Sequence, residues 1–322
     1  MTNDSMSSLP PLDDGEEYYT YNETEFPYEL ILLCPSECKV ISSFAFLVST
    51  FGLVGNGTVI WLLGFRMKRN PFTTFILNLA VADLGVLICI VVQGIVYIIY
   101  FFLNRNMVIN MYSLLAWMLL SNLFFLMYFT GQFLLTAISI DRCVSVLFPI
   151  WHRCHRPTYL STTVCAILWV TSCLLYLLSY VVFLTPLLEK ILIMLTVIPF
   201  LCLPLMIISS LILFIKVCFK SPKHKQGKTL RAIFLIVLFF LMFAFPLTAT
   251  SFIYMFIIPN FQYHIITQYS FLGASLNSSV NPFIYFLLGR QKAGQKREKM
   301  KNILQRLFKE EEGYGADTDS TV

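Results

Sequence analysis

The sequence predicts an all-α membrane protein built as a seven-transmembrane helix bundle. The first observation is composition, because hydrophobic residues make up 57% of the 322 residues and charged residues only 13%. A soluble globular domain carries about a quarter charged residues, so a chain this apolar needs lipid around it. The second observation is that the apolar residues form separate blocks, each long enough for the roughly 20 residues with which a helix crosses a bilayer. The blocks lie at residues 40–65, 72–103, 107–141, 158–184, 188–219, 229–258 and 264–288.

The blocks differ in length and in how sharply they end. The second and third are longer than a bilayer requires, which indicates helices that tilt or protrude. The boundary between the fourth and fifth is the weakest, because only Thr185-Pro186 and Glu189-Lys190 interrupt the apolar run. The fifth block also contains Pro199 and Pro204.

Basic residues predict the orientation of the bundle. They cluster after the first, third, fifth and seventh blocks, whereas only Lys39, Arg105 and Lys190 lie on the other side. Cytoplasmic loops collect Lys and Arg, so we expect the N-terminus outside the cell and the C-terminus inside. The first eight residues lack the basic region and apolar core of a cleaved signal, so the first span would direct targeting. The net charge of +5 then suits anionic inner-leaflet lipids and does not indicate nucleic-acid binding.

Residues 1–38 are polar and acidic and predict a disordered extracellular tail. Asn3 and Asn22 stand in glycosylation acceptor patterns within it. Tyrosines among its acidic residues fit either sulfation or an unmodified, solvated tail. Cys34 and Cys38 are close enough in sequence to form only a small, strained disulfide loop.

The remaining chain divides into the bundle, a surface helix and a tail. Residues 39–289 form the bundle, and residues 290–309 carry apolar side chains three and four positions apart. This spacing predicts an amphipathic helix on the cytoplasmic membrane surface. Residues 310–322 predict a disordered cytoplasmic tail. Its last three residues match a ligand for PDZ domains, which capture a free carboxylate and an apolar terminal side chain: Ser320, Thr321 and Val322.

Few polar residues lie at lipid depth, and each is a functional hypothesis because burying it in a membrane is costly. Asp83 lies in the middle of the second block, Asn56 in the first, and Asn277 and Asn281 lie one helical turn apart in the seventh. Together they predict an interior polar cluster. The cluster suits either water or a sodium ion held by hard oxygen ligands, or hydrogen-bonded packing without an ion.

Asp141-Arg142 ends the third block at the predicted cytoplasmic edge. Adjacent opposite charges at such an edge can act as a switch when their pairing changes, or can simply anchor the helix at the interface. Pro204, Pro246 and Pro282 lie inside later blocks and predict kinks, because proline removes a helical hydrogen bond.

Taken in order, these features resemble the rhodopsin-like G-protein-coupled receptors over residues 40–308. The resemblance rests on Gly55-Asn56, Leu79 to Asp83, Asp141-Arg142-Cys143, Trp169, Pro204, Pro246 and Asn281 to Tyr285. Longer stretches are similar to the Mas and Mas-related receptors. These are Phe65 to Phe72, Leu135 to Pro157 and Asn277 to Phe286.

The resemblance implies a multi-pass plasma-membrane receptor that couples to heterotrimeric G proteins and has no enzymatic activity. Arg142 would meet the inserted G-protein helix, Ile150 would be an apolar anchor in the second cytoplasmic loop, and Tyr285 would move on activation. The polar cluster around Asp83 would be a sodium-linked switch, and no other cofactor is expected. Receptor kinases and arrestin would act on Thr318, Ser320 and Thr321.

The sequence also departs from the pattern of rhodopsin-like receptors. Ala244 occupies the position of the usual tryptophan before Pro246, and the Mas-related group, which the sequence resembles, also tends to lack that tryptophan. Trp117 stands near the position of an outer disulfide cysteine, Gly131 where a serine often helps to bind sodium, and Phe124 where amine receptors carry an aspartate.

The same departures predict an aromatic, uncharged ligand pocket for a peptide or a hydrophobic small molecule. The alternative is that these aromatic residues are core packing. The candidate pocket residues are Gln93, Tyr97, Phe124, Tyr128, Ser251, Tyr254, Phe271 and Ser275.

Other functional classes fit less well. A retinal receptor needs a lysine in the seventh block, and residues 264–288 contain none. A transporter commonly shows internal repeats and several mid-span charges, whereas Asp83 stands alone. A non-signalling scavenger or scaffold receptor and a constitutively active receptor stay open, because the tryptophan and the outer disulfide cysteines are missing.

Overall fold

The computed structural model describes most of the bundle. It describes residues 36–67, 70–103, 111–157, 159–183, 201–202, 204–215, 234–244, 246–249, 263–289 and 304. The described elements are helical: α2 (Ser36–Trp61), η1 (Leu62–Arg66), α3 (Pro71–Leu103), α4 (Met111–Leu147), α5 (Pro149–Cys154), α6 (Leu160–Phe183), η3 (Phe240–Ala244) and α10 (Tyr263–Gly289). The segments η1 and η3 have π-helical geometry.

Helix occurs in each of the seven predicted ranges. Four described stretches are long and apolar enough to cross a membrane: Lys39–Arg66, Pro71–Val96, Leu119–Leu147 and Leu160–Leu178. Shorter apolar helices, Pro204–Ile215 and Phe234–Ala249, lie in the fifth and sixth ranges. The 27-residue α10 fills the seventh. The orientation with the N-terminus outside stays a prediction.

The helix of the third span extends beyond the Asp141-Arg142 pair, which the sequence places at the membrane edge. Helix α4 continues to Leu147, so both charged residues lie within the helix. The residues after Arg142 contain no helix breaker, and the chain leaves the helix only at Phe148 (φ −123°, ψ 63°). The next residue is Pro149, and a residue before proline is driven out of the helical region by the proline ring.

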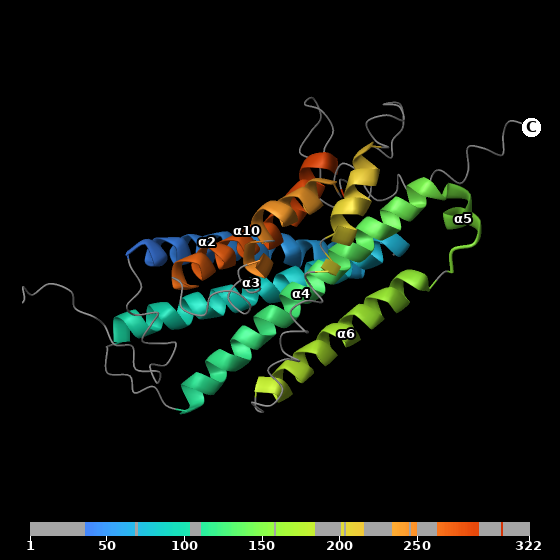
Figure 1. Ribbon diagram of the computed structural model, residues 1–322. Helices are drawn as coiled ribbons and strands as arrows, with labels where there is room; N and C mark the ends of the chain where they lie inside the picture. The colour runs from blue at the N-terminus through green and yellow to red at the C-terminus, as the bar shows by residue number, and fades with distance from the viewer. Residues whose placement is uncertain are drawn as a thin grey trace, which may run out of the picture.

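Helix α3 lies in the middle of the described bundle, where it packs against α2, α4, α6 and α10 (Figure 1). The Trp169 indole on α6 donates a hydrogen bond to Asn78 Oδ1 on α3 at 3.0 Å. Helices α2 and α10 run side by side at very close range (Figure 1). A Cβ on Gly52 would lie 2.2 Å from Ser279 Oγ, so only glycine permits this approach.

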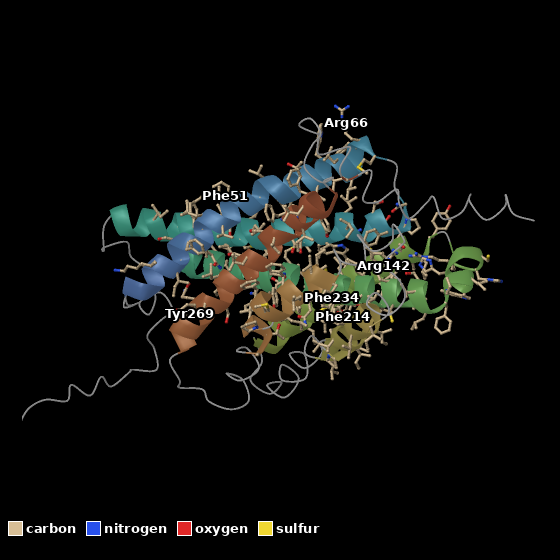
Figure 2. All side chains as sticks on the ribbon, turned by 90° about the horizontal axis from the view of Figure 1, so that it is seen from above. Phe51, Arg66, Arg142, Phe214, Phe234 and Tyr269 are labelled. Carbon is tan, nitrogen blue, oxygen red and sulfur yellow. The ribbon has the colours of Figure 1, made fainter. Side chains whose placement is uncertain are left out.

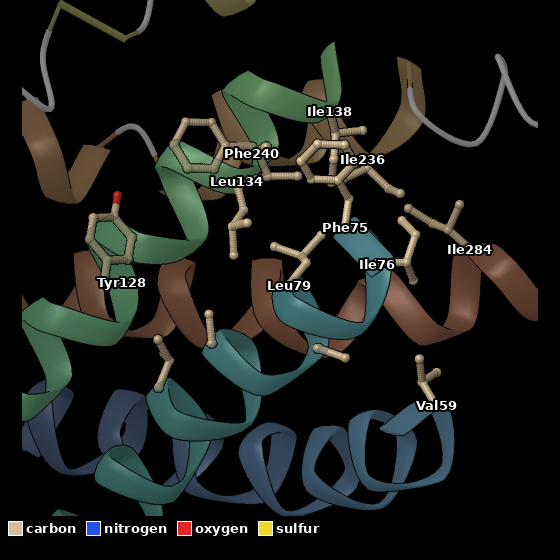
Figure 3. Close-up of a cluster of buried hydrophobic side chains, with 14 of the residues drawn as sticks. Val59, Phe75, Ile76, Leu79, Tyr128, Leu134, Ile138, Ile236, Phe240 and Ile284 are labelled. Atoms are coloured by element: carbon tan, nitrogen blue, oxygen red, sulfur yellow. The ribbon is translucent and has the colours of Figure 1, made fainter. Parts of the chain in front are cut away.

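Apolar side chains fill the bundle and also cover its outside, as a lipid environment requires. Inside, Phe75, Leu79, Leu134 and Phe240 form part of one buried cluster (Figure 3). Outside, large hydrophobic side chains such as Phe51 are exposed (Figure 2). Of the predicted surface helix at 290–309 the structure describes Leu304 alone, a helical and buried residue.

Candidate functional site

The structure brings the four predicted polar residues of the bundle together. Asp83 on α3 is buried, and Asn281 Nδ2 on α10 donates a hydrogen bond to its Oδ2 at 2.7 Å. The Ser278 side chain is a further hydrogen-bond partner of Asp83. Asn277 and Asn56 are buried nearby, so α2, α3 and α10 all contribute to one polar cluster.

Pro282 explains why Asn56 belongs to this cluster. A proline within a helix has no N–H to donate to the carbonyl four residues earlier, which here is that of Ser278. Asn56 Nδ2 donates to that carbonyl oxygen at 2.9 Å and to its own helix at Gly52 O at 3.1 Å. The side chain from α2 therefore satisfies the carbonyl group that Pro282 leaves without a helical donor.

A small cavity adjoins Asp83. Its volume is about 10 Å³, close to what one water molecule needs. Among the described residues, the Oδ1 atoms of Asn277 and Asn281 have no hydrogen-bond partner. The lining residues are Asp83, Val86, Met127, Tyr128, Gly131, Gln132, Leu135, Phe240, Asn277 and Ser278.

The chemistry of this lining fits a small hard cation or a water molecule. It offers a carboxylate, a hydroxyl and amide oxygens, which are the groups that bind sodium-like ions. Gly131 leaves space on the α4 side, because a Cβ there would meet only Ala82 Cβ at 3.9 Å.

A second cluster of polar residues lies near the C-terminal end of α4, close to α5, and includes Arg142 (Figure 2). The guanidinium of Arg142 contacts Asp141 Oδ2 through Nη2 at 2.5 Å and through Nε at 3.1 Å. The same guanidinium lies over the Phe72 ring of α3, 4.4 Å from its centroid. Arg142 is buried, so this pairing holds it inside the bundle.

Asp141 has partners that the sequence analysis did not single out. Arg156 Nη2 lies 2.8 Å from Asp141 Oδ1, and His152 Nε2 lies 3.7 Å from the same oxygen. Arg156 also donates to Ser161 Oγ at 2.7 Å and contacts His152 Nε2 at 2.7 Å. The network ties α4, α5 and the start of α6 to one carboxylate. In the sequence, Arg156 is one of the basic residues after the third block that indicate the orientation of the bundle.

Of two further residues with predicted coupling roles, one is exposed and the other is buried. Ile150 on α5 is 77% exposed, so its side chain is available to a partner. Tyr285 on α10 is buried in the same core cluster as Ile284 and Leu79.

The described part of the predicted ligand pocket is packed. Phe124 is fully buried, and its ring contacts those of Phe271 at 4.7 Å and Tyr128 at 6.1 Å between centroids. Ser275 is also fully buried, and Gln93 is half-buried on α3. For Phe124 and Tyr128 the structure therefore favours the alternative that they are core packing.

Several predicted residues lie outside the described residues. They are Asn3 and Asn22 in the first tail, Ser251 and Tyr254 in the sixth span, Thr318, Ser320, Thr321 and Val322 in the last tail, and the side chain of Tyr97.

Comparison with known proteins defines the class. The family model for the 7 transmembrane receptor (rhodopsin family) matches residues 55–285, which is more than half of the chain. The human protein "Proto-oncogene Mas" is 38% identical over 275 residues, covering 82% of this chain and 82% of that protein. "Mas-related G-protein coupled receptor member D" of Macaca fascicularis is 36% identical over 302 residues, covering 88% and 90% respectively. The human "Mas-related G-protein coupled receptor member X1" is 35% identical over 297 residues, covering 86% of each chain.

The chain therefore belongs to the rhodopsin family of seven-transmembrane receptors and, within it, to the Mas and Mas-related G-protein-coupled receptors. This assignment confirms the resemblance read from the sequence motifs and supports a membrane location. The family is a class of receptors.

Proposed function

We propose that this protein is a plasma-membrane receptor that converts binding of an extracellular peptide or hydrophobic small molecule into activation of a heterotrimeric G protein. The observation that carries the proposal is the burial of Arg142 and its pairing with Asp141. Its guanidinium is buried and held by Asp141, while Ile150 on the adjacent α5 is exposed. Arg142 can leave its carboxylate partner and contact a helix that the G protein inserts, and the exposed Ile150 beside it can anchor the same partner. This arrangement suits a docking site that switches between two states.

Within this proposal the N-terminal tail is extracellular, with glycans on Asn3 and Asn22, and the C-terminal tail is cytoplasmic. Receptor kinases and arrestin act on that tail, and a PDZ-domain protein binds Ser320, Thr321 and Val322. These partners are proposed from the sequence patterns and from family membership.

We also propose a regulatory sodium ion in the cavity beside Asp83. Asp83 would hold it together with oxygen atoms of Asn277 and Ser278, and the bound charge would stabilise the buried carboxylate in its ionised form. The support is the ionisable carboxylate, the partnerless Asn277 Oδ1 and the space of about one water molecule.

The test of G-protein coupling is ligand-free activation in cells carrying a panel of Gα biosensors, at matched surface expression. We expect activation above mock-transfected cells, and Arg142→Ala should abolish it. Arg66→Ala is the matched control, because Arg66 is an exposed arginine at the end of the first span, stacked over Trp61 at 5.1 Å. Silence with every Gα, continued through peptide and lipid screens, would favour a non-signalling scavenger receptor.

A further inference from the structure

A buried hydrogen bond links the third and sixth spans. The Tyr128 hydroxyl on α4 and Thr248 Oγ1 lie 2.9 Å apart, and both side chains are buried. The two residues are 120 positions apart in the chain, so the bond joins elements that the backbone does not hold together. Within the membrane interior neither hydroxyl can turn to bulk water as an alternative partner.

Tyr128 contacts both the aromatic cluster predicted as a ligand pocket and the cavity beside Asp83. Its ring stacks on Phe124, with an interplanar angle of 7°, and Phe124 in turn contacts Phe271 of α10. The same Tyr128 side chain lines the cavity beside Asp83, together with Phe240 of the sixth span. Figure 3 shows the Tyr128 hydroxyl pointing to the side of the cluster on which Phe240 lies. Tyr128 therefore lies where the aromatic cluster, the polar cavity and the sixth span meet.

The sixth span is irregular next to this bond. Residues Phe240–Ala244 form a π-helical segment, and Pro246 follows, so the regular helical hydrogen bonding is interrupted twice before Thr248. On its other side the segment touches α10, where a Cβ on Gly273 would lie 2.0 Å from the Phe243 carbonyl oxygen. A helix interrupted in this way needs side-chain contacts to fix its position.

We infer that the Tyr128–Thr248 hydrogen bond positions the sixth span in the resting arrangement, and so lowers ligand-free activity. The arrangement is a resting one because Arg142 is paired with Asp141 and buried. The bond reaches the sixth span only two residues after Pro246, just beyond the irregular segment. The inference rests on the proposed signalling function, and Tyr128 and Thr248 act as positioning residues.

Three variants isolate the hydrogen bond. Tyr128→Phe removes only the hydroxyl, Thr248→Val replaces the other hydroxyl with a methyl group of similar shape, and Thr248→Ser keeps a hydroxyl. Hydrogen bonds between helices in membranes correspond to a shift of roughly three- to twentyfold in an equilibrium. We expect Tyr128→Phe and Thr248→Val each to raise ligand-free Gα activation by about threefold or more. The double variant should do no more than either single change, and Thr248→Ser should behave like the unchanged receptor.

A second readout does not depend on signalling. Hydrogen–deuterium exchange of the purified receptor reports the sixth span directly, and peptides covering residues 234–249 should exchange faster in Tyr128→Phe and Thr248→Val but not in Thr248→Ser. Additive effects in the double variant, lower ligand-free activity, or equal behaviour of Thr248→Ser and Thr248→Val would each overturn the inference. Faster exchange in variants that stay silent with every Gα, also through the peptide and lipid screens, would leave the positioning contact in place and reject the receptor proposal instead.

Discussion

Asn56 Nδ2 donates a hydrogen bond to the carbonyl oxygen of Ser278 at 2.9 Å, across the interface between α2 and α10. Pro282 leaves this carbonyl without its helical donor, so a residue of the first span supplies the missing donor to the helix of the seventh. The bond therefore fixes the geometry of the segment that carries Asn277 and Asn281, the two asparagines beside Asp83.

Asn56→Ala should destabilise the protein because it leaves this buried carbonyl without a donor. We expect a loss of about 1–3 kcal/mol, the usual cost of an unsatisfied buried polar group. The measurement is the thermal unfolding midpoint of the purified receptor in detergent. Gly57→Ala is the neighbouring control, because a Cβ there has nothing within 4 Å. An unchanged midpoint for Asn56→Ala would contradict the assigned role of the bond.

Gly273→Ala tests the close approach between α10 and the π-helical segment of the sixth span. The added Cβ would lie 2.0 Å from the Phe243 carbonyl oxygen, a backbone atom that cannot rotate away. The two helices must separate, and we expect a loss of about 1–3 kcal/mol in stability together with lower surface expression. Gly64→Ala serves as the comparison, since a Cβ at Gly64 also meets nothing within 4 Å. Equal stability of both variants would show that the contact is not needed.

Much of this architecture could be predicted from the sequence, because lipid imposes strong rules on composition. Apolar blocks of sufficient length predicted where each helix lies, and helix is present in all seven ranges. The polar cluster was predictable for the same reason. Asp83 and the asparagines have no favourable place in lipid, so they gather inside the bundle.

Contacts that depend on loop geometry or side-chain packing were not predictable. The pairing of Arg156 with Asp141 requires α5 to fold back between α4 and α6, and no local pattern specifies that path. The aromatic cluster of Phe124, Tyr128 and Phe271 was predicted as a candidate pocket. A sequence alone does not distinguish aromatic residues that line a cavity from those that fill it. The sequence places the end of the third block at residue 141 because charged residues mark the expected membrane edge, but a helix can continue past that edge, as α4 does to Leu147.

Gly131→Ser tests the proposed sodium ion. The added Cβ would meet only Ala82 Cβ at 3.9 Å, and Gly131 lines the cavity, so we expect the serine hydroxyl to supply another hard oxygen beside Asp83. In thermal unfolding measured across NaCl concentrations, with choline chloride keeping the ionic strength constant, sodium should stabilise the unchanged receptor. Gly131→Ser should then reach half of the effect at a lower sodium concentration.

Asp83→Asn is the negative control for that titration, because it removes the charge while keeping the shape of the side chain. It should abolish the sodium dependence. If the unchanged receptor shows no difference between sodium and choline, the cavity holds water and the sodium proposal fails.

Arg156→Ala tests the network that surrounds Asp141. Arg156 joins Asp141 to Ser161 and also contacts His152, which itself lies 3.7 Å from Asp141, so its removal should loosen α5 from the ends of α4 and α6. Asp141 keeps Arg142 as a partner, and we therefore expect a loss near the lower end of the range for breaking a buried ion pair, about 3 kcal/mol or less. Arg156→Lys should rescue this only in part, because a single ammonium group cannot reproduce the forked contacts of a guanidinium. Because α5 carries Ile150, coupling to Gα should weaken in parallel with the unfolding midpoint. Normal coupling and stability in Arg156→Ala would show that Asp141 and Arg142 alone hold this end of the bundle.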